Sequence, residues 1–174
     1  MRLKCWHIIG AIFTIIVGTL LHFTYEWSGN NPVVALFSPV NESTWEHLKL
    51  IFVPMLLFTI IEYFVNGKEI KNFIPVKVFS ILLGMLTIVV SFYTYTGIIG
   101  QNYLVADIGT FILGVLVAYY YSYRTLQTDR FATKEAIQWS LLILIILCAT
   151  FVIFTYRPPH IALFQDPNTL TYGK

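Results

Sequence analysis

Histidine and carboxylate side chains recur at helical spacing in an otherwise apolar chain. His22 and Glu26 lie four residues apart at the end of the first apolar segment. Glu42 and Glu46 are also four residues apart, and His47 comes directly before the second apolar segment. Residues four apart share one face of a helix. Because imidazole and carboxylate groups together suit Zn, Mn or Fe, these residues predict a cation site that could hold a divalent metal.

A further carboxylate, Asp107, lies about one turn into a later apolar segment, close to the small residues Thr110 and Gly114. Small residues allow helices to pack closely, and ionisable residues at membrane depth are costly and usually functional. We therefore expect Asp107 to face the other helices and to meet His22 or Glu46. The predicted ligand-binding residues are His22, Glu26, Glu42, Glu46, His47 and Asp107. The predicted metal ligands are His22, Glu26, Glu46 and His47.

The composition excludes several classes of protein. Only 11% of the 174 residues are charged, 57% are hydrophobic, and the mean hydropathy is +0.71. A soluble domain carries about 25% charged residues, so a soluble domain, a disordered chain and a disulfide scaffold are all excluded. The net charge of +2 is too small to indicate a nucleic-acid partner. The chain is an integral membrane protein by composition, with membrane lipids as its first partners and no indication of its oligomeric state.

Five apolar segments have the length of membrane spans, which is about 20 residues. A helix satisfies its own backbone groups in a bilayer, so each segment is expected to be helical. The sequence thus predicts an all-α, polytopic membrane protein with five transmembrane helices in one bundle, forming a single domain over residues 1–174. The predicted spans are residues 6–27, 48–65, 75–97, 103–121 and 136–156.

The basic residues predict how the chain lies in a cell membrane. Eight of the 11 lysines and arginines fall before the first span, between the second and third, between the fourth and fifth, or, in the case of Lys77, at the start of the third. By the positive-inside rule the N-terminus is then cytoplasmic and the tail of residues 157–174 is external. This orientation places all six predicted site residues at the outer side. The tail could cover them as a lid or could be a frayed terminus.

Small residues on the first span predict how it packs. Gly10, Thr14 and Gly18 precede His22 at intervals of four residues, and we expect this row to face other helices. The row ends in His22 and Glu26, which should therefore point inward.

Two further expectations concern the second span. Asn41 is expected to be its N-cap, which would place Glu42 in the first helical turn. Glu62 lies near the other end of the same span, where we expect it to pair with a lysine such as Lys77.

One segment resembles a known group of sequences. The run Ser38-Pro-Val-Asn-Glu-Ser-Thr-Trp-Glu-His47, together with residues 21–29, resembles an uncharacterised family of small bacterial integral membrane proteins. The likeness extends over most of the chain and is specific mainly in this segment. The resemblance implies a bacterial inner membrane and implies no activity.

Three functions remain open at this stage. The first is an outward-facing polar pocket that binds a cation or a small lipophilic or amine ligand. The second is a metal-dependent hydrolase or transferase that acts on a lipid or an envelope precursor, and the third is a structural or assembly subunit without a ligand. The spacing identifies no catalytic residue and does not decide whether the chain is an enzyme.

Overall fold

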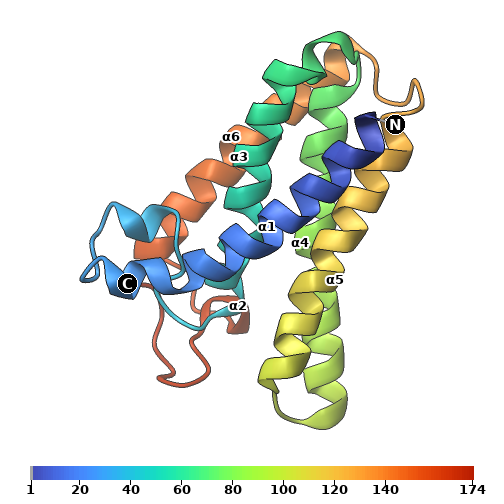
Figure 1. The fold of residues 1–174 in the computed structure, drawn as a ribbon. Coiled ribbons are helices and arrows are strands. Elements are labelled where there is room, and N and C mark those ends of the chain that lie inside the picture. The colour runs from blue at the N-terminus through green and yellow to red at the C-terminus, as the bar shows by residue number, and fades with distance from the viewer. Residues whose placement is uncertain (1) are drawn as a thin grey trace.

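The structure, a computed structural model, describes residues 2–174 as an all-helical chain (Figure 1). Five of its helices are long and apolar enough to cross a membrane, which confirms the predicted fold class. The helices are α1 (Arg2–Trp27), α2 (Thr44–His47), α3 (Lys49–Val65), α4 (Phe73–Ile99), α5 (Leu104–Thr125) and α6 (Lys134–Tyr156). Three short 3₁₀ turns, η1 (Val34–Leu36), η2 (Gly67–Glu69) and η3 (Ala162–Phe164), lie in the connections and the tail.

The helices extend beyond the apolar segments that predict them. Helix α5 continues to Thr125 and α4 to Ile99, two to four residues past the predicted ends. Hydropathy falls where polar and interfacial side chains begin, whereas the backbone hydrogen bonds of a helix continue through them. The short helix α2 runs almost directly into α3, so the second span is continuous from Thr44 to Val65.

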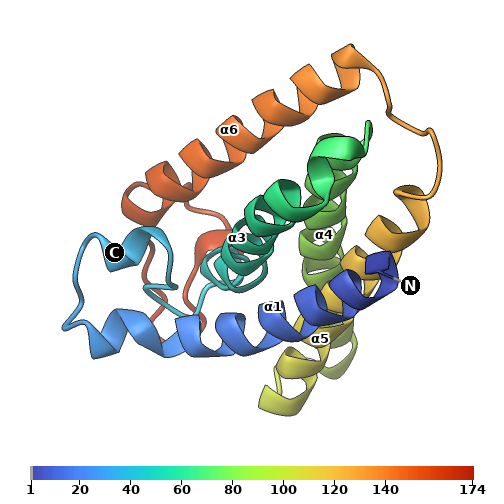
Figure 2. The same ribbon diagram turned by 45° about the horizontal axis from the view of Figure 1, so that its top comes forward.

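Helix α3 lies between α1 and α6 in the view of Figure 2; it packs on α1 and α4, and α6 packs on α4. Helices α4 and α5 form a long antiparallel hairpin (Figure 1). Gly114 of α5 allows this close approach, because a Cβ there would lie only 2.8 Å from the carbonyl oxygen of Gly84. The hairpin, α1 and α3 therefore enclose a common interior.

The small-residue face of α1 packs inward, as predicted. Thr14 is fully buried and its hydroxyl lies 3.0 Å from the hydroxyl of Tyr119 on α5. A Cβ at Gly10 would collide with the Tyr119 ring, and one at Gly18 would overlap the carbonyl oxygen of Leu50 on α3. These contacts fix the rotation of α1, and that rotation directs His22, one turn further on, towards α2.

The predicted pair between Glu62 and Lys77 is confirmed. The Lys77 ammonium donates to Glu62 Oε2 at 2.6 Å, and both side chains are almost fully buried. The pair joins α3 to α4 at the end of α3 that lies away from His47. Because each charge satisfies the other, this buried pair needs no ligand.

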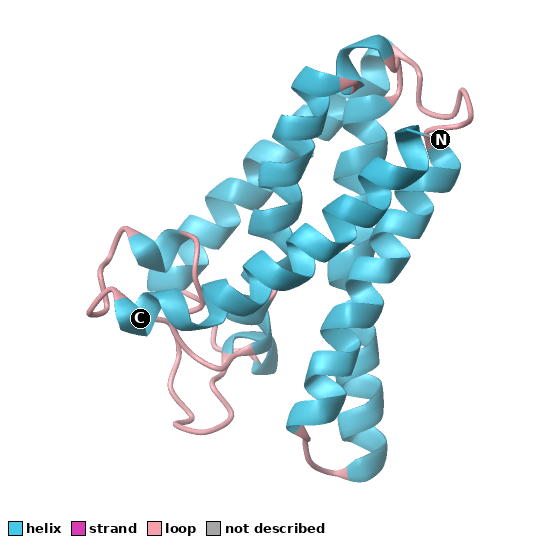
Figure 3. Cartoon of the chain, viewed as in Figure 1, coloured by secondary structure: helices cyan, strands magenta, loops and turns pink. Residues whose placement is uncertain are grey.

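The long connection 28–43 and the tail 157–174 lie together at the other end of the bundle (Figure 3). The tail is packed back onto the helices. The Lys174 amide donates to the Thr155 carbonyl at 2.9 Å, and the Asn41 side chain donates to the Gly173 carbonyl at 3.0 Å. We call this end of the bundle the site end, because His22, Glu42 and His47 all lie there.

Candidate metal-binding site

The local fold around α2 places Glu42 outside the helix. The N-cap is Ser43, whose hydroxyl accepts from the Glu46 amide at 3.4 Å, and not Asn41 as expected. Asn41 instead accepts from the Ser43 amide at 2.9 Å in the turn before the helix. The helix thus begins two residues later than the sequence indicated. Glu42, freed from the first turn, can reach across to His47.

Three side chains converge at this turn. The Nε2 atoms of His22 and His47 lie 3.2 Å apart. Glu42 places Oε2 3.4 Å from His47 Nε2 and Oε1 4.0 Å from His22 Nε2. One ligand atom from each residue lies within 4.8 Å of the other two. We call these three residues the His22–Glu42–His47 cluster.

The protonation of His47 follows from its second contact. Its Nδ1 atom lies 3.0 Å from the Ser43 carbonyl oxygen, which can only accept a hydrogen bond. The proton of the neutral ring is therefore on Nδ1, and Nε2 presents a lone pair to His22 and Glu42. Metal-binding histidines usually hold their second nitrogen in this way, against a carbonyl or a carboxylate.

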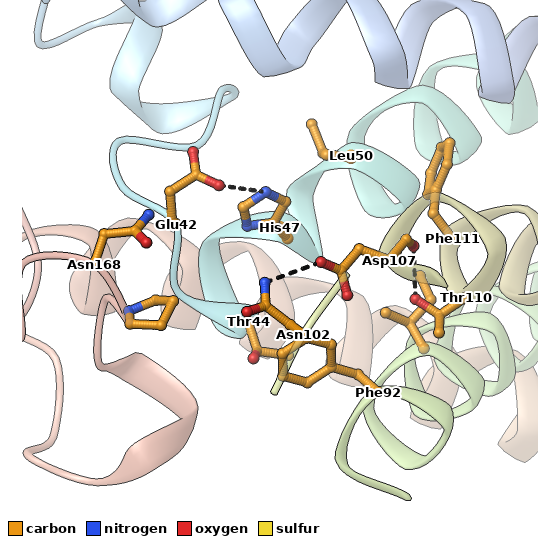
Figure 4. A pocket seen from close by; sticks show the side chains of 12 residues that line it. Glu42, Thr44, His47, Leu50, Phe92, Asn102, Asp107, Thr110, Phe111 and Asn168 are labelled. Atoms are coloured by element: carbon orange, nitrogen blue, oxygen red, sulfur yellow. Dashed lines mark hydrogen bonds and ion pairs between the residues drawn. The ribbon is translucent and has the colours of Figure 1, made fainter. Parts of the chain in front are cut away.

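The cluster borders a cavity of about 110 Å³ at the site end (Figure 4). Glu42 and His47 form one wall, and Asp107 and Asn102 lie across from them. The remaining lining residues come from α2, α3, α4, α5 and the tail; they are Thr44, Leu50, Ile88, Phe92, Thr110, Phe111, Pro167 and Asn168. His22 and Glu42 are each more than a third exposed, so the cluster is open to solution.

Asp107 shares this cavity but has partners of its own. The Tyr95 hydroxyl donates to one carboxylate oxygen, and the Asn102 side chain donates to the other at 3.1 Å. The structure therefore places Asp107 with His47 on one cavity, while its hydrogen bonds go to Tyr95 and Asn102 and not to His22 or Glu46.

Glu46 lies apart from the cluster. Its carboxylate is buried and accepts from the Lys49 ammonium at 2.6 Å and from the Val40 amide at 3.0 Å. Glu26 is exposed, and within residues 3–174 the structure gives its carboxylate no polar contact. The structure thus brings together His22, Glu42 and His47, adds Asp107 across the cavity, and leaves Glu26 and Glu46 outside.

Lys49 is a buried structural neighbour of Glu46 that sequence reasoning missed. It is fully buried and also donates to the Ala35 carbonyl and the Thr155 hydroxyl, at 2.8 and 2.6 Å. It thereby joins α3, η1 and α6 at the site end. Its spacing of three residues from Glu46, which predicts an ion pair on one helix face, was the available signal.

The tail is anchored beside the cluster by Asp166. Burial opposes ionisation of this carboxyl, but hydrogen bonds from the amides of Asn168, Glu42 and Thr169 outweigh it, and the pKa of Asp166 lies below its usual value. The Glu42 amide donates to it at 3.2 Å. Phe164 adds an apolar anchor by packing on Trp45. The tail is therefore a packed wall of the cavity, and it holds the backbone of Glu42 in place.

The arrangement has the features of an open metal site. Two imidazoles and one carboxylate supply three ligands, which is the number that catalytic zinc sites use. The adjoining cavity leaves room for a fourth ligand, such as water or a small anion. Neutral nitrogen ligands favour zinc and other transition metals over calcium or magnesium.

Comparison with known proteins yields a family and no further relative. No curated protein and no solved structure matches the chain. One family profile matches all of it, from residue 1 to residue 174. The chain therefore belongs to DUF6512, a family of unknown function.

Proposed function

We propose that this protein binds one divalent transition-metal ion through His22, Glu42 and His47 and holds a small ligand in the adjoining cavity. One observation carries the proposal. Two ligand atoms that are about 2.0–2.1 Å from a tetrahedral zinc ion lie about 3.3 Å apart. The Nε2 atoms of the two histidines are separated by 3.2 Å, and Glu42 Oε2 lies 3.4 Å from His47 Nε2. Two of the three ligand pairs therefore already have nearly the spacing that zinc requires, and the third, His22 Nε2 to Glu42 Oε1, is wider at 4.0 Å.

The charges of the cluster also favour a cation. His47 Nε2 and the Glu42 carboxylate face each other with lone pairs, which repel unless a proton or a metal ion lies between them. A hydrogen bond between the two imidazoles can satisfy His22 and His47. It still leaves the Glu42 carboxylate facing His47 Nε2, which has no proton to donate to it. A divalent ion satisfies all three groups at once.

Metal analysis tests the proposal. The full chain is purified in detergent, stripped with a chelator and dialysed separately against zinc, manganese and ferrous iron. We expect zinc to be retained at one ion per chain and to be lost in His22→Gln and His47→Gln. Glu26→Gln is the matched control, because it removes an ionisable side chain at the same end outside the cluster. Zinc retention that is equal in all four proteins, or absent from the unaltered chain, would overturn the proposal.

A second candidate function is metal-dependent hydrolysis or group transfer on a lipid or an envelope precursor. It is favoured by the open side of the cluster, since water bound to zinc loses a proton near neutral pH and becomes a nucleophile. The test is turnover of ester and phosphodiester probes in micelles by the zinc-loaded chain. Zinc binding without turnover would leave the binding function and remove the enzymatic one.

We further propose that the chain lies in a bacterial inner membrane with its N-terminus in the cytoplasm and the site end outside. The support is the excess of lysine and arginine at the end away from the site, including Lys68, Lys71, Arg124 and Arg130. An enzymatic reporter fused after Lys174 should be active outside the cell membrane. Activity confined to the cytoplasm would contradict this orientation.

A further inference from the structure

The cavity beside the cluster has two walls of opposite electrostatic character once a metal is bound. Glu42 and His47 form one wall, and Asp107 with Asn102 forms the other (Figure 4). Apolar side chains of α3, α4 and α5 also line the cavity, among them Leu50, Phe92 and Phe111. A ligand that fills this cavity must therefore offer different chemistry at its two ends.

The cavity wall formed by Asp107 and Asn102 favours a positively charged group on the ligand. Both partners of the carboxylate, Tyr95 and Asn102, donate hydrogen bonds to it, and neither brings a positive charge. Within residues 3–174 the structure pairs Asp107 with no basic side chain. The carboxylate therefore lines the cavity without a counter-ion, and a primary ammonium group is a compact organic cation that can donate hydrogen bonds to it.

The opposite wall, formed by Glu42 and His47, would favour an anionic oxygen on the ligand once a metal ion is bound. A divalent ion held by two neutral imidazoles and one carboxylate retains one positive charge. An ion held there would accept a further ligand from the adjoining cavity, and a phosphate oxygen, which is a hard anionic ligand, would suit it.

Size and lining restrict the ligand further. Pockets for drug-sized molecules are about 300–1,000 Å³, whereas this cavity measures about 110 Å³. It has room for a small charged group. The apolar lining residues favour a short methylene link. The Asp107 carboxylate offers acceptor oxygens that a primary ammonium group can use and a quaternary ammonium group, which has no N–H, cannot.

We propose that the pocket binds a phosphate group joined by a short methylene link to a primary amine, which is the chemistry of phosphoethanolamine. This inference rests on the proposed metal site. The same chemistry occurs in the free compound and in the headgroup of an ethanolamine phospholipid. The site end lies at the ends of the membrane-capable helices, where a lipid headgroup would also lie.

Binding measurements on the zinc-loaded full chain test the inference. The soluble probes are phosphoethanolamine, phosphocholine, ethanolamine and inorganic phosphate, each titrated by calorimetry in detergent. Phosphatidylethanolamine and phosphatidylcholine are compared by native mass spectrometry of the chain in mixed micelles. Asp107→Asn removes the negative wall, and Glu26→Gln is again the matched carboxylate control.

We expect phosphoethanolamine to bind at least tenfold more tightly than phosphocholine or either fragment. Asp107→Asn should abolish this preference while zinc content stays unchanged, and Glu26→Gln should keep it. Preference for the soluble probe alone identifies the free compound, and preference in both arms identifies the lipid headgroup. Equal binding of phosphoethanolamine and phosphocholine, or a preference that survives Asp107→Asn, overturns the inference. Loss of zinc from the unaltered chain would instead refute the metal site itself.

Discussion

His22 and His47 bring their Nε2 atoms within 3.2 Å of each other although they are 25 residues apart and lie on different helices. Neither α1 nor α2 alone positions this pair. The contact depends on how closely α1 packs on α3, and that distance is set at Gly18, where α1 meets the Leu50 carbonyl. The geometry of the cluster is thus coupled to a helix–helix contact one turn away.

Gly18→Leu should therefore damage both stability and metal binding. The added side chain has no room between α1 and α3, and overpacking of this kind costs about 1–3 kcal/mol. The variant should denature at a lower temperature in detergent and should bind zinc more weakly, because His22 is displaced. Gly109→Leu is the matched control, since a Cβ there meets no atom within 4 Å. Unchanged stability and zinc affinity in Gly18→Leu would contradict the inward packing of this face.

Lys49→Met should destabilise the chain without removing a metal ligand. The substitution leaves the Glu46 carboxylate buried without its ion-pair partner. Removing one partner of a buried pair lowers the free energy of unfolding by about 3–5 kcal/mol. Unfolding in a denaturing detergent measures the loss. The double variant Lys49→Met/Glu46→Leu should recover most of the stability, because it removes both charges together. Folded chains of either variant should still bind zinc, and a failure of the double variant to recover would show that Lys49 has another role.

The all-helical fold and its five spans could be predicted because each span is a local run of apolar residues. The inward face of α1 and the Glu62–Lys77 pair were also predictable, since helical periodicity and complementary charge define them. The membership of the cluster was harder to predict. It depends on the turn before α2, where capping by Ser43 in place of Asn41 moves Glu42 out of the helix.

The placement of Glu46 could not be read from its spacing alone. Glu42 and Glu46 share a helical interval, which suggested a common site. The buried ammonium of Lys49 instead draws Glu46 towards Thr155 and η1. Tertiary contacts with α6 and with the connection 28–43 decide which carboxylate meets the histidines. No local sequence pattern encodes these tertiary contacts.

The Asp166 anchor should release the tail in acid. Its carboxyl has a pKa below the ordinary aspartate value of about 3.9, so it stabilises the folded tail fully at pH values above that ordinary value. That stabilisation is lost as the pH falls through the lowered pKa of the folded state. Hydrogen exchange of tail amides, corrected for intrinsic rates, should therefore increase below this range.

Asp166→Asn provides the comparison for the tail. The variant should show faster tail exchange already at neutral pH and no acid-induced step, because Asn keeps one acceptor oxygen but has no charge to lose. Its zinc affinity should fall, since the Glu42 amide loses its carboxylate partner. Tail exchange that follows the same pH profile in both proteins would assign the anchoring to Phe164 and the backbone contacts alone.

X-ray absorption at the zinc edge tests the central claim most directly. The claim is that His22, Glu42 and His47 bind one zinc ion together. The zinc-loaded chain should show a first shell of nitrogen and oxygen at about 2.0–2.1 Å, with outer-shell scattering from two imidazole rings. His47→Gln should lose one of these rings, and Glu26→Gln should leave the spectrum unchanged. A spectrum with no imidazole scattering, or one that His47→Gln does not alter, would contradict the site.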